Sequence, residues 1–343
     1  MHFTPVVIVV VVPIPGVGWL DRIATPNTGY THKNVTYSSA YMAIMEGNPL
    51  NNPGRNFNAY LNSFLLPHRI AAWVVDRTGV WMGHYVLCYL RNFLLASLVY
   101  WALGAVFHYH CYIHPRAKRL FANRPMPSKE VIWDQISLAQ GSLILYTLYT
   151  IVDESLIEEG YTQVYHTIDE IGGWLNYLFF TVVYFCCVEV CIYWMHRTLH
   201  TNKILYKHIH LRHHIYNKAE MMSPWASLAF HPLDGILQAS PYTWVMPFVP
   251  CHFLTHFIFL FFTALWATYI HDGLDWNVDP IMGSKYHTVH HTHFIYNYGQ
   301  VFTFCDRFWG TFREPEGPTG IVKRRQRSTT VSPAVAATDK KDD

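Results

Sequence analysis

The sequence predicts an all-α integral membrane protein with about three transmembrane helices, a proline-broken helical hairpin and a cytosolic helical cap that holds a histidine-rich dimetal site. Composition is the first reason: 51% of the residues are hydrophobic and 14% are charged, whereas soluble domains carry about 25% charged residues. Histidine content is the second, since 22 histidines nearly equal the 25 Lys and Arg residues combined. The formal net charge of +2 excludes a nucleic-acid binder, which needs a basic surface.

Three apolar stretches approach the ~20 residues that a membrane helix needs. They run from His84 to Phe107, from about Ile136 to Val152 and from Trp174 to Met195. We therefore expect residues 84–195 to form transmembrane helices and their loops. Residues 1–83 are expected to form an N-terminal region that is lumenal or lies at the membrane interface.

A fourth apolar region, from about Ile236 to Ile270, is interrupted by Pro241, Pro247 and Pro250. Proline inside a helix removes a backbone hydrogen bond and clashes with the preceding turn. We expect two shorter helices that meet at a break. Such a hairpin would enter and leave the membrane on the same side.

The charges of the loops predict the orientation, because cytosolic loops carry an excess of Lys and Arg. The first loop is basic and is expected in the cytosol, whereas the second is acidic and is expected in the lumen. The basic residues are Arg116, Lys118, Arg119, Arg124 and Lys129, and the acidic residues are Asp153, Glu154, Glu158, Glu159, Asp169 and Glu170. With the hairpin included, the chain from His196 to the C-terminus is expected on the cytosolic face.

Residues 314–343 are rich in Pro, Gly, Thr, Ala and charge and are expected to form a disordered cytosolic tail. Lys340 and Lys341 stand at the fourth and third positions from the end of the sequence. This pattern resembles the dilysine signal that retrieves membrane proteins to the endoplasmic reticulum, and such a signal works only on a cytosolic tail. The sequence therefore predicts a multi-pass protein of the endoplasmic reticulum membrane.

The histidines form three spaced clusters within residues 196–313, which we expect to be the catalytic region. Imidazoles at i and i+4, or at i, i+3 and i+4, share one face of a helix. Neutral imidazole is the commonest metal ligand and suits iron, zinc and copper. Eight such ligands exceed the three or four of a mononuclear zinc site and indicate two metals. They are His196 and His200, then His210, His213 and His214, then His287, His290 and His291.

Two further histidines are candidate ligands at the ends of the hairpin. His231 precedes it, and His271 follows it at a membrane boundary, where an ionisable group tends to be functional. His208 and His293 fall off the ligand-bearing helix faces and are left out. Three carboxylates could either orient ligand imidazoles through the second ring N–H or cap helices: Asp234, Asp272 and Asp275.

The three clusters, in this order around broken membrane helices, resemble the fatty acid hydroxylase and sterol desaturase superfamily. The surrounding sequence, over roughly Pro115 to Phe312, is similar to the sterol C5-desaturases, also called lathosterol oxidases. The similar segments are Ala229–Gln238, Ile270–Gly273, Tyr296–Gln300, Phe302–Thr303, Asp306–Arg307 and Gly310–Phe312.

This resemblance implies a reaction in which O2 and two electrons introduce the C5=C6 double bond into a Δ7-sterol taken from the bilayer. The electrons come from NADH through cytochrome b5 reductase and cytochrome b5. The implied cofactor is a non-haem di-iron centre held by the eight clustered histidines, with His231 and His271 as additions, and zinc can replace the iron during purification. Four basic residues could dock cytochrome b5 or could reflect the cytosolic charge bias alone: Lys203, Lys207, Arg212 and Lys218.

Histidine spacing alone leaves other functions open. A sterol C4-methyl oxidase or a fatty acid hydroxylase of the same superfamily would share every ligand. A divalent-metal transporter or a membrane zinc-storage protein would also be rich in histidine. A transporter, however, places ionisable ligands near mid-span, whereas these histidines follow the apolar stretches. The resemblance of the flanking segments is what favours C5 desaturation.

Overall fold

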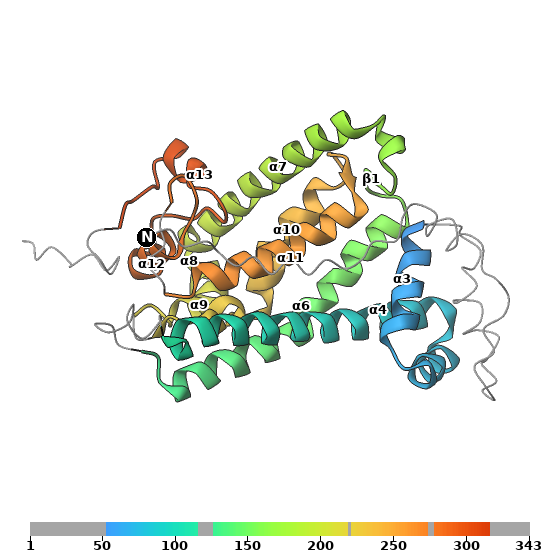
Figure 1. The fold of residues 1–343 in the computed structure, drawn as a ribbon, viewed down its shortest axis with the longest axis horizontal. Helices are drawn as coiled ribbons and strands as arrows, with labels where there is room; N and C mark the ends of the chain where they lie inside the picture. The colour runs from blue at the N-terminus through green and yellow to red at the C-terminus, as the bar shows by residue number, and fades with distance from the viewer. Residues whose placement is uncertain (1–52, 116–125, 219–220, 274–277, 316–343) are drawn as a thin grey trace, which may run out of the picture.

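The computed structural model describes residues 53–115, 126–218, 221–273 and 278–315. These residues form an elongated helical bundle with one short sheet (Figure 1). Most of the predicted N-terminal region, the greater part of the basic first loop and nearly all of the predicted C-terminal tail lie outside the described residues, and so do the two lysines near the end of the sequence.

The long helices make up the body of the bundle (Figure 1). They are α3 (Pro53–Leu65), α4 (His68–His108), α6 (Lys129–Glu158), α7 (Trp174–Thr201), α10 (Pro232–Val245), α11 (Phe253–Ile270) and α12 (Ser284–His293). The shorter helical pieces are η2 (Tyr109–Ile113), η3 (Ile168–Ile171), α8 (Lys203–Leu205), η4 (Tyr206–His210), α9 (Leu211–His214), η6 (Pro224–Leu228) and α13 (Phe304–Phe308). The strands β1 (Val164–Tyr165) and β2 (Cys251–His252) pair in parallel.

Four helical segments are long and apolar enough to cross a membrane: α4 continued by η2, α6, α7 and α11. The three predicted apolar stretches lie inside the first three of these, and α7 begins at Trp174. α4 begins at His68, earlier than the predicted apolar stretch, and it contains a bend at Gly79. Gly79 has a φ of 78° there, a left-handed value that glycine adopts without a steric cost.

The break predicted in the fourth apolar region is present. α10 ends at Val245 and α11 begins at Phe253. Pro247 and Pro250 lie in the segment between the two helices, whereas Pro241 lies inside α10. α11 has 18 residues and qualifies as a candidate span by itself. The prediction of about three transmembrane helices had not included it.

The two helices of this broken region form a hairpin. Its two ends lie beside one imidazole, because the rings of Phe230 and His271 are 6.2 and 5.1 Å from the ring of His213. The chain therefore leaves the neighbourhood of His213 along α10 and returns to it along α11. This path brings His271 to the clustered histidines.

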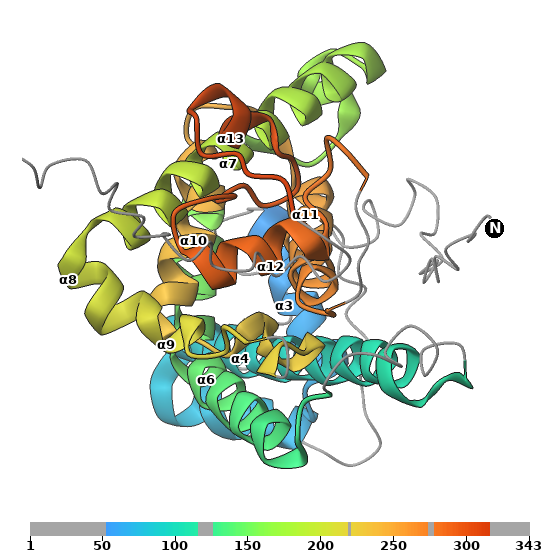
Figure 2. The ribbon, with the colours of Figure 1, turned by 90° about the vertical axis from the view of Figure 1, so that its left-hand side faces the viewer.

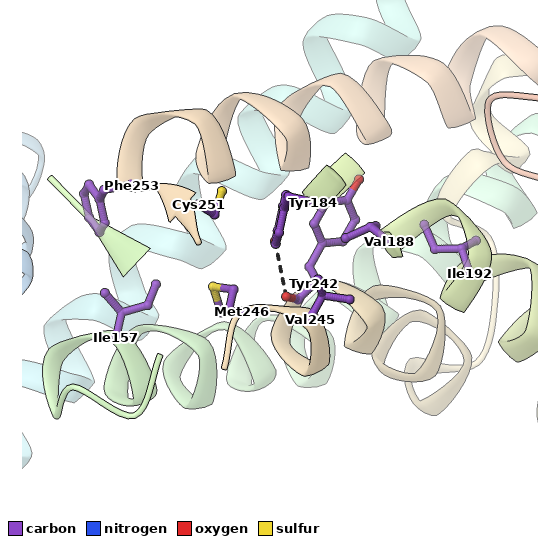
Figure 3. Close-up of a cluster of buried hydrophobic side chains, with 9 residues drawn as sticks. All are labelled: Ile157, Tyr184, Val188, Ile192, Tyr242, Val245, Met246, Cys251 and Phe253. Carbon is purple, nitrogen blue, oxygen red and sulfur yellow. Dashed lines mark hydrogen bonds between the residues drawn. The ribbon is translucent and has the colours of Figure 1, made fainter. Parts of the chain in front are cut away.

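A buried apolar cluster joins α7 to the hairpin (Figure 3). Tyr184, Val188 and Ile192 are four residues apart on α7 and therefore share one helical face. The Tyr184 hydroxyl donates a hydrogen bond of 3.2 Å to the carbonyl oxygen of Tyr242 on α10. Four residues further along the same face stands His196. Packing of this apolar stripe thus sets the direction in which the first histidines of the site point.

Part of the acidic second loop was assigned wrongly. Asp153, Glu154 and Glu158 lie inside α6 and are only 3–6% exposed. Each carboxylate has a partner that offsets the cost of its burial, and hydropathy counting cannot detect such pairs. The partners are His256 on α11, Arg91 on α4 and Arg55 on α3.

Candidate metal centre

Nine of the ten histidines predicted as ligands converge at one end of the bundle, where α7, α9, α11 and α12 meet (Figure 2). They form two groups, and within each group the ring nitrogens lie within 4.8 Å of one another. All of them except His200 are buried. The first group is His196, His200, His210, His214 and His290, and the second group is His213, His271, His287 and His291.

Each histidine triplet contributes to both groups. Its i and i+4 members share one group, and its i+3 member belongs to the other. A helix turns by about 100° per residue, so the i+4 ring is rotated about 40° to one side of the i ring and the i+3 ring about 60° to the other side. The triplets therefore hold the groups side by side, and the ring centroids of His214 and His291, from different groups, are 4.5 Å apart.

Four of these imidazoles are oriented by acceptors behind them. A carboxylate or carbonyl oxygen only accepts, so the Nδ1 that faces it carries the proton and the Nε2 of the neutral ring keeps its lone pair. Partners of this kind orient the histidine ligands of metal sites. Nδ1 of His210 is 2.8 Å from Oδ2 of Asp234, and Nδ1 of His196, His271 and His290 is 2.9, 2.7 and 2.8 Å from the carbonyl oxygens of Tyr298, Ala267 and Tyr296.

The Nε2 atoms within each group face one another. In the first group, Nε2 of His210 is 2.9 and 3.0 Å from Nε2 of His200 and His214, and in the second, Nε2 of His271 is 3.3 and 3.1 Å from Nε2 of His213 and His287. Two nitrogens bound to one metal at about 2.1 Å are about 3.0 to 3.4 Å apart. The donor atoms therefore fit two metal ions, one in each group.

Burial favours the neutral form of six imidazoles outside the candidate spans. Desolvation lowers the pKa of His271 to about 4. Desolvation, reinforced by neighbouring imidazoles, also lowers the pKa of five others well below 6.5: His213, His214, His287, His290 and His291. A metal binds the neutral form of histidine. Because every donor is a nitrogen, the site suits iron, zinc or copper rather than Mg²⁺ or Ca²⁺, which prefer oxygen.

The loop after α12 supplies two of the carbonyl acceptors, those of Tyr296 and Tyr298. Asn297, between them, has a φ of 57°, so the chain turns sharply there. The carboxylate of Asp306 accepts hydrogen bonds of 2.8 Å from the backbone N–H groups of Tyr298 and Gly299 and fixes the loop. Histidine spacing could not reveal these acceptors, because every residue carries a carbonyl group.

His231 lies outside both groups. It is the N-cap residue of α10, and its Nδ1 accepts a hydrogen bond of 3.2 Å from the backbone N–H of Leu233. His208 and His293 lie outside both groups as well. Three carboxylates were expected either to orient ligand imidazoles or to cap helices. Asp234 contacts the ligand imidazole of His210, Asp272 is buried, and Asp275 falls outside the described residues.

A third set of potential ligands, His84, Cys88 and Glu158, lies where α3 packs on α4 and α6. Its carboxylate accepts hydrogen bonds of 3.1 Å from Nε of Arg55 and 2.7 Å from Nδ2 of Asn58. A guanidinium at this distance opposes the binding of a further cation. These residues form a hydrogen-bonded cluster that attaches α3 to the bundle.

A cavity of about 370 Å³ extends from the histidines into the bundle. His196 of the first group and His213, His271 and His287 of the second line one part of it. Apolar side chains of α4 and α11 line another part, among them Leu95, Val99, Phe257, Leu260 and Phe261. The cavity therefore joins both histidine groups to an apolar interior.

Comparisons with known proteins agree on one family. The family model described as fatty acid hydroxylase matches residues 181–311, which include every clustered histidine. A Δ7-sterol-C5(6)-desaturase of Nicotiana tabacum is 40% identical over 238 residues, which cover 68% of this chain and 87% of that protein. A lathosterol oxidase of Rattus norvegicus is 35% identical over 241 residues, which cover 66% of this chain and 77% of that protein. No solved structure matches this chain.

Proposed function

The chain belongs to the sterol C5-desaturases of the fatty acid hydroxylase family, and from this premise we propose that it is an O2-dependent oxidoreductase that introduces the C5=C6 double bond into a Δ7-sterol. The observation that carries the proposal is the cavity that joins a paired histidine centre to an apolar interior. The relatives do not favour the alternatives, a C4-methyl oxidase or a fatty acid hydroxylase.

The cofactor that we propose is a pair of iron ions, one held by each histidine group. Bound there, iron supplies the redox chemistry that activates O2 for the removal of two hydrogens from adjacent carbons. Four electrons and four protons reduce O2 to two waters: two of each come from the sterol, two electrons come from the donor, and two protons come from solvent. Zinc lacks redox chemistry, so zinc in a purified sample would be a replacement for iron.

The protein's own residues orient the metal ligands and exclude water. Asp234 and three backbone carbonyls hold ligand rings with Nε2 toward the centre. The apolar walls of the cavity keep water from the reacting carbons. Leu95 on α4 and Phe261 on α11 line the cavity and are 36% and 50% exposed. The sterol enters between these helices from the bilayer.

We further propose an orientation in the endoplasmic reticulum membrane with the histidine end of the bundle in the cytosol. Four exposed basic residues on or just after the short helices beside the histidines support a docking site for cytochrome b5, which relays electrons from NADH through its reductase: Lys203, Lys207, Arg212 and Lys218. In this arrangement residues 196–313 are catalytic, 84–195 anchor the chain, 1–83 are lumenal or interfacial, and 314–343 form a cytosolic tail.

Expression in a cell that lacks its own C5-desaturase tests the function. Wild-type protein should produce the 5,7-diene, and His213→Ala should not, because this change removes one of the four nitrogen donors of the second group. Sterols are analysed by gas chromatography and mass spectrometry, with protein amount matched by immunoblot. Absence of the diene with wild type, or its persistence with His213→Ala, would reject the assignment.

A further inference from the structure

Gln238 lines the cavity beside a residue that orients a metal ligand, and its side-chain oxygen is available to accept a hydrogen bond. Gln238 stands one turn after Asp234 on α10, and its Nε2 donates a hydrogen bond of 2.8 Å to Oδ1 of Asp234. The other oxygen of Asp234 accepts from Nδ1 of His210 at 2.8 Å. A carboxylate that receives both contacts is an acceptor, so the NH2 of the Gln238 amide must face it.

The contact of Nε2 with Asp234 also determines the direction of Oε1, the other polar atom of the Gln238 amide. Among the hydrogen bonds of the described residues, Oε1 of Gln238 takes part in none, although the residue lines the cavity together with His213 and His271. An amide oxygen is a pure acceptor. The geometry therefore presents an oriented acceptor close to the histidines, and its natural partner is a hydroxyl group.

The substrate of the proposed function carries such a hydroxyl at the required position. In a sterol, the oxygen on C3 is three bonds from C5, which at bond lengths near 1.5 Å amounts to roughly 4 Å. If C5 and C6 face the metal centre, the hydroxyl must also be bound at the histidine end of the cavity. The hydrocarbon tail then extends along the apolar part between α4 and α11.

The polar residues at the other end of the cavity are too far away for this role. One of them is Asp153 on α6, which accepts a hydrogen bond of 2.9 Å from the hydroxyl of Thr243 on α10. Thr243 stands nine residues after Asp234 (243 minus 234), which is roughly 13 Å at 1.5 Å per residue. A hydroxyl bound there would hold C5 well away from the histidines.

We propose that Oε1 of Gln238 accepts a hydrogen bond from the 3β-hydroxyl of the sterol and so directs the C5–C6 edge toward the metal centre. This inference rests on the proposed desaturase function. It assigns substrate recognition to the same helix turn that orients His210, because Asp234 contacts both side chains. Hydroxyl recognition and ligand orientation are thereby coupled.

The test compares a 3β-hydroxy-Δ7-sterol with its 3-deoxy analogue on the same protein in lipid nanodiscs. Wild type should prefer the hydroxylated sterol by about five- to tenfold in kcat/KM, the value of one ordinary hydrogen bond. In Gln238→Leu the preference should fall to about one. Because the two ligands are compared on one sample, partial loss of metal or of active protein cancels from the ratio.

Gln300→Leu is the matched control, since Gln300 is a second glutamine that lines the cavity. The Gln300→Leu variant should keep the wild-type preference for the hydroxylated sterol over its 3-deoxy analogue. A preference that survives in Gln238→Leu, or that disappears in Gln300→Leu, would overturn the proposal. If Gln238→Leu does not fold, Gln238→Met keeps the length of the side chain and replaces the oxygen by a weak acceptor.

Competition of both sterols against a radiolabelled 3β-hydroxy-Δ7-sterol for the purified protein measures the preference in binding alone, without turnover. A wild type that binds with the expected preference but forms no 5,7-diene would reject the desaturase function and leave hydroxyl recognition standing. A wild type that forms the diene but does not distinguish the two sterols would reject only the role of Gln238.

Discussion

At the scale of single residues, the hairpin carries a histidine at each of its ends, and the two differ in their surroundings. Nδ1 of His271 faces the carbonyl oxygen of Ala267, and its Nε2 is 3.3 Å from that of His213. Nδ1 of His231 instead accepts the backbone N–H of Leu233 at the first turn of α10. Only His271 therefore directs a free lone pair toward other ligand nitrogens.

We expect His271→Ala to lower formation of the 5,7-diene at least about 100-fold, since loss of a partner behind a ligand already costs about 10- to 100-fold. His231→Ala should keep activity within about twofold and lose about 1 kcal/mol of stability, the usual cost of removing an N-cap. Diene formation and metal per protein, measured on both variants, check this. Equal losses of activity in the two variants would contradict it.

The residues of the site could largely be predicted from the sequence, but the division of the histidines into two groups could not. The spacing of His210, His213 and His214 predicts three imidazoles on one side of a helix, which is correct to within the 100° that separates i+3 from i+4. Which metal position each ring serves depends on the rings supplied by α7, α11 and α12, and no local pattern contains that information. Backbone acceptors such as the Tyr298 carbonyl have no signature in the sequence.

At the scale of helices, Gly104 and Gly141 differ in the space around their Cα atoms. A Cβ at Gly104 on α4 would overlap the ring of Trp225, whose backbone carbonyl accepts a hydrogen bond of 2.9 Å from the Tyr100 hydroxyl. A Cβ at Gly141 on α6 would meet no atom of the described residues within 4 Å. The first glycine allows a close approach of α4 to η6, and the second has no such role.

Gly104→Ala should destabilise the protein by about 1–3 kcal/mol, the range for overpacking a well-packed contact. Gly141→Ala should be neutral or should stabilise it by up to about 1 kcal/mol, since alanine favours a helix over glycine. Thermal unfolding in detergent measures both changes. Destabilisation by Gly141→Ala that equals that of Gly104→Ala would show that contact with Trp225 is not the cause.

Helix ends were predicted less well than helix interiors. Hydropathy located α7 from Trp174 because the chain turns apolar there at once. It ended the second apolar stretch at Val152, although α6 continues to Glu158, since a residue scale treats Asp153 and Glu154 as exposed charges. Their partners His256 and Arg91 lie 103 and 63 residues away, so tertiary contacts decide where this helix ends.

At the scale of the whole molecule, the histidine end of the bundle is a set of buried bases. Burial lowers the pKa of His271 to about 4 and holds that of His213 and His287 well below 6.5. In the unfolded chain these imidazoles titrate near 6.5. Between pH 6.5 and the lower folded values, the unfolded state binds more protons, so stability falls as the pH falls.

The metal-free protein should therefore unfold at a lower temperature at pH 5 than at pH 7.5. His271 alone contributes a loss of about 2 kcal/mol at pH 5, at 1.36 kcal/mol for each pKa unit. Thermal unfolding of chelator-treated protein across this range measures the effect, and His271→Ala should show a smaller pH dependence. A midpoint temperature that does not change between pH 7.5 and pH 5 would contradict the buried neutral state.

The shared use of α12 has a consequence for the order in which the chain is made. His287, His290 and His291 leave the ribosome after all the other histidines of both groups. Until they arrive, the second group consists of His213 and His271, and the first lacks one of its five members. A chain that stops before α12 therefore lacks donors of both groups, so neither metal position can be completed until translation has passed His291.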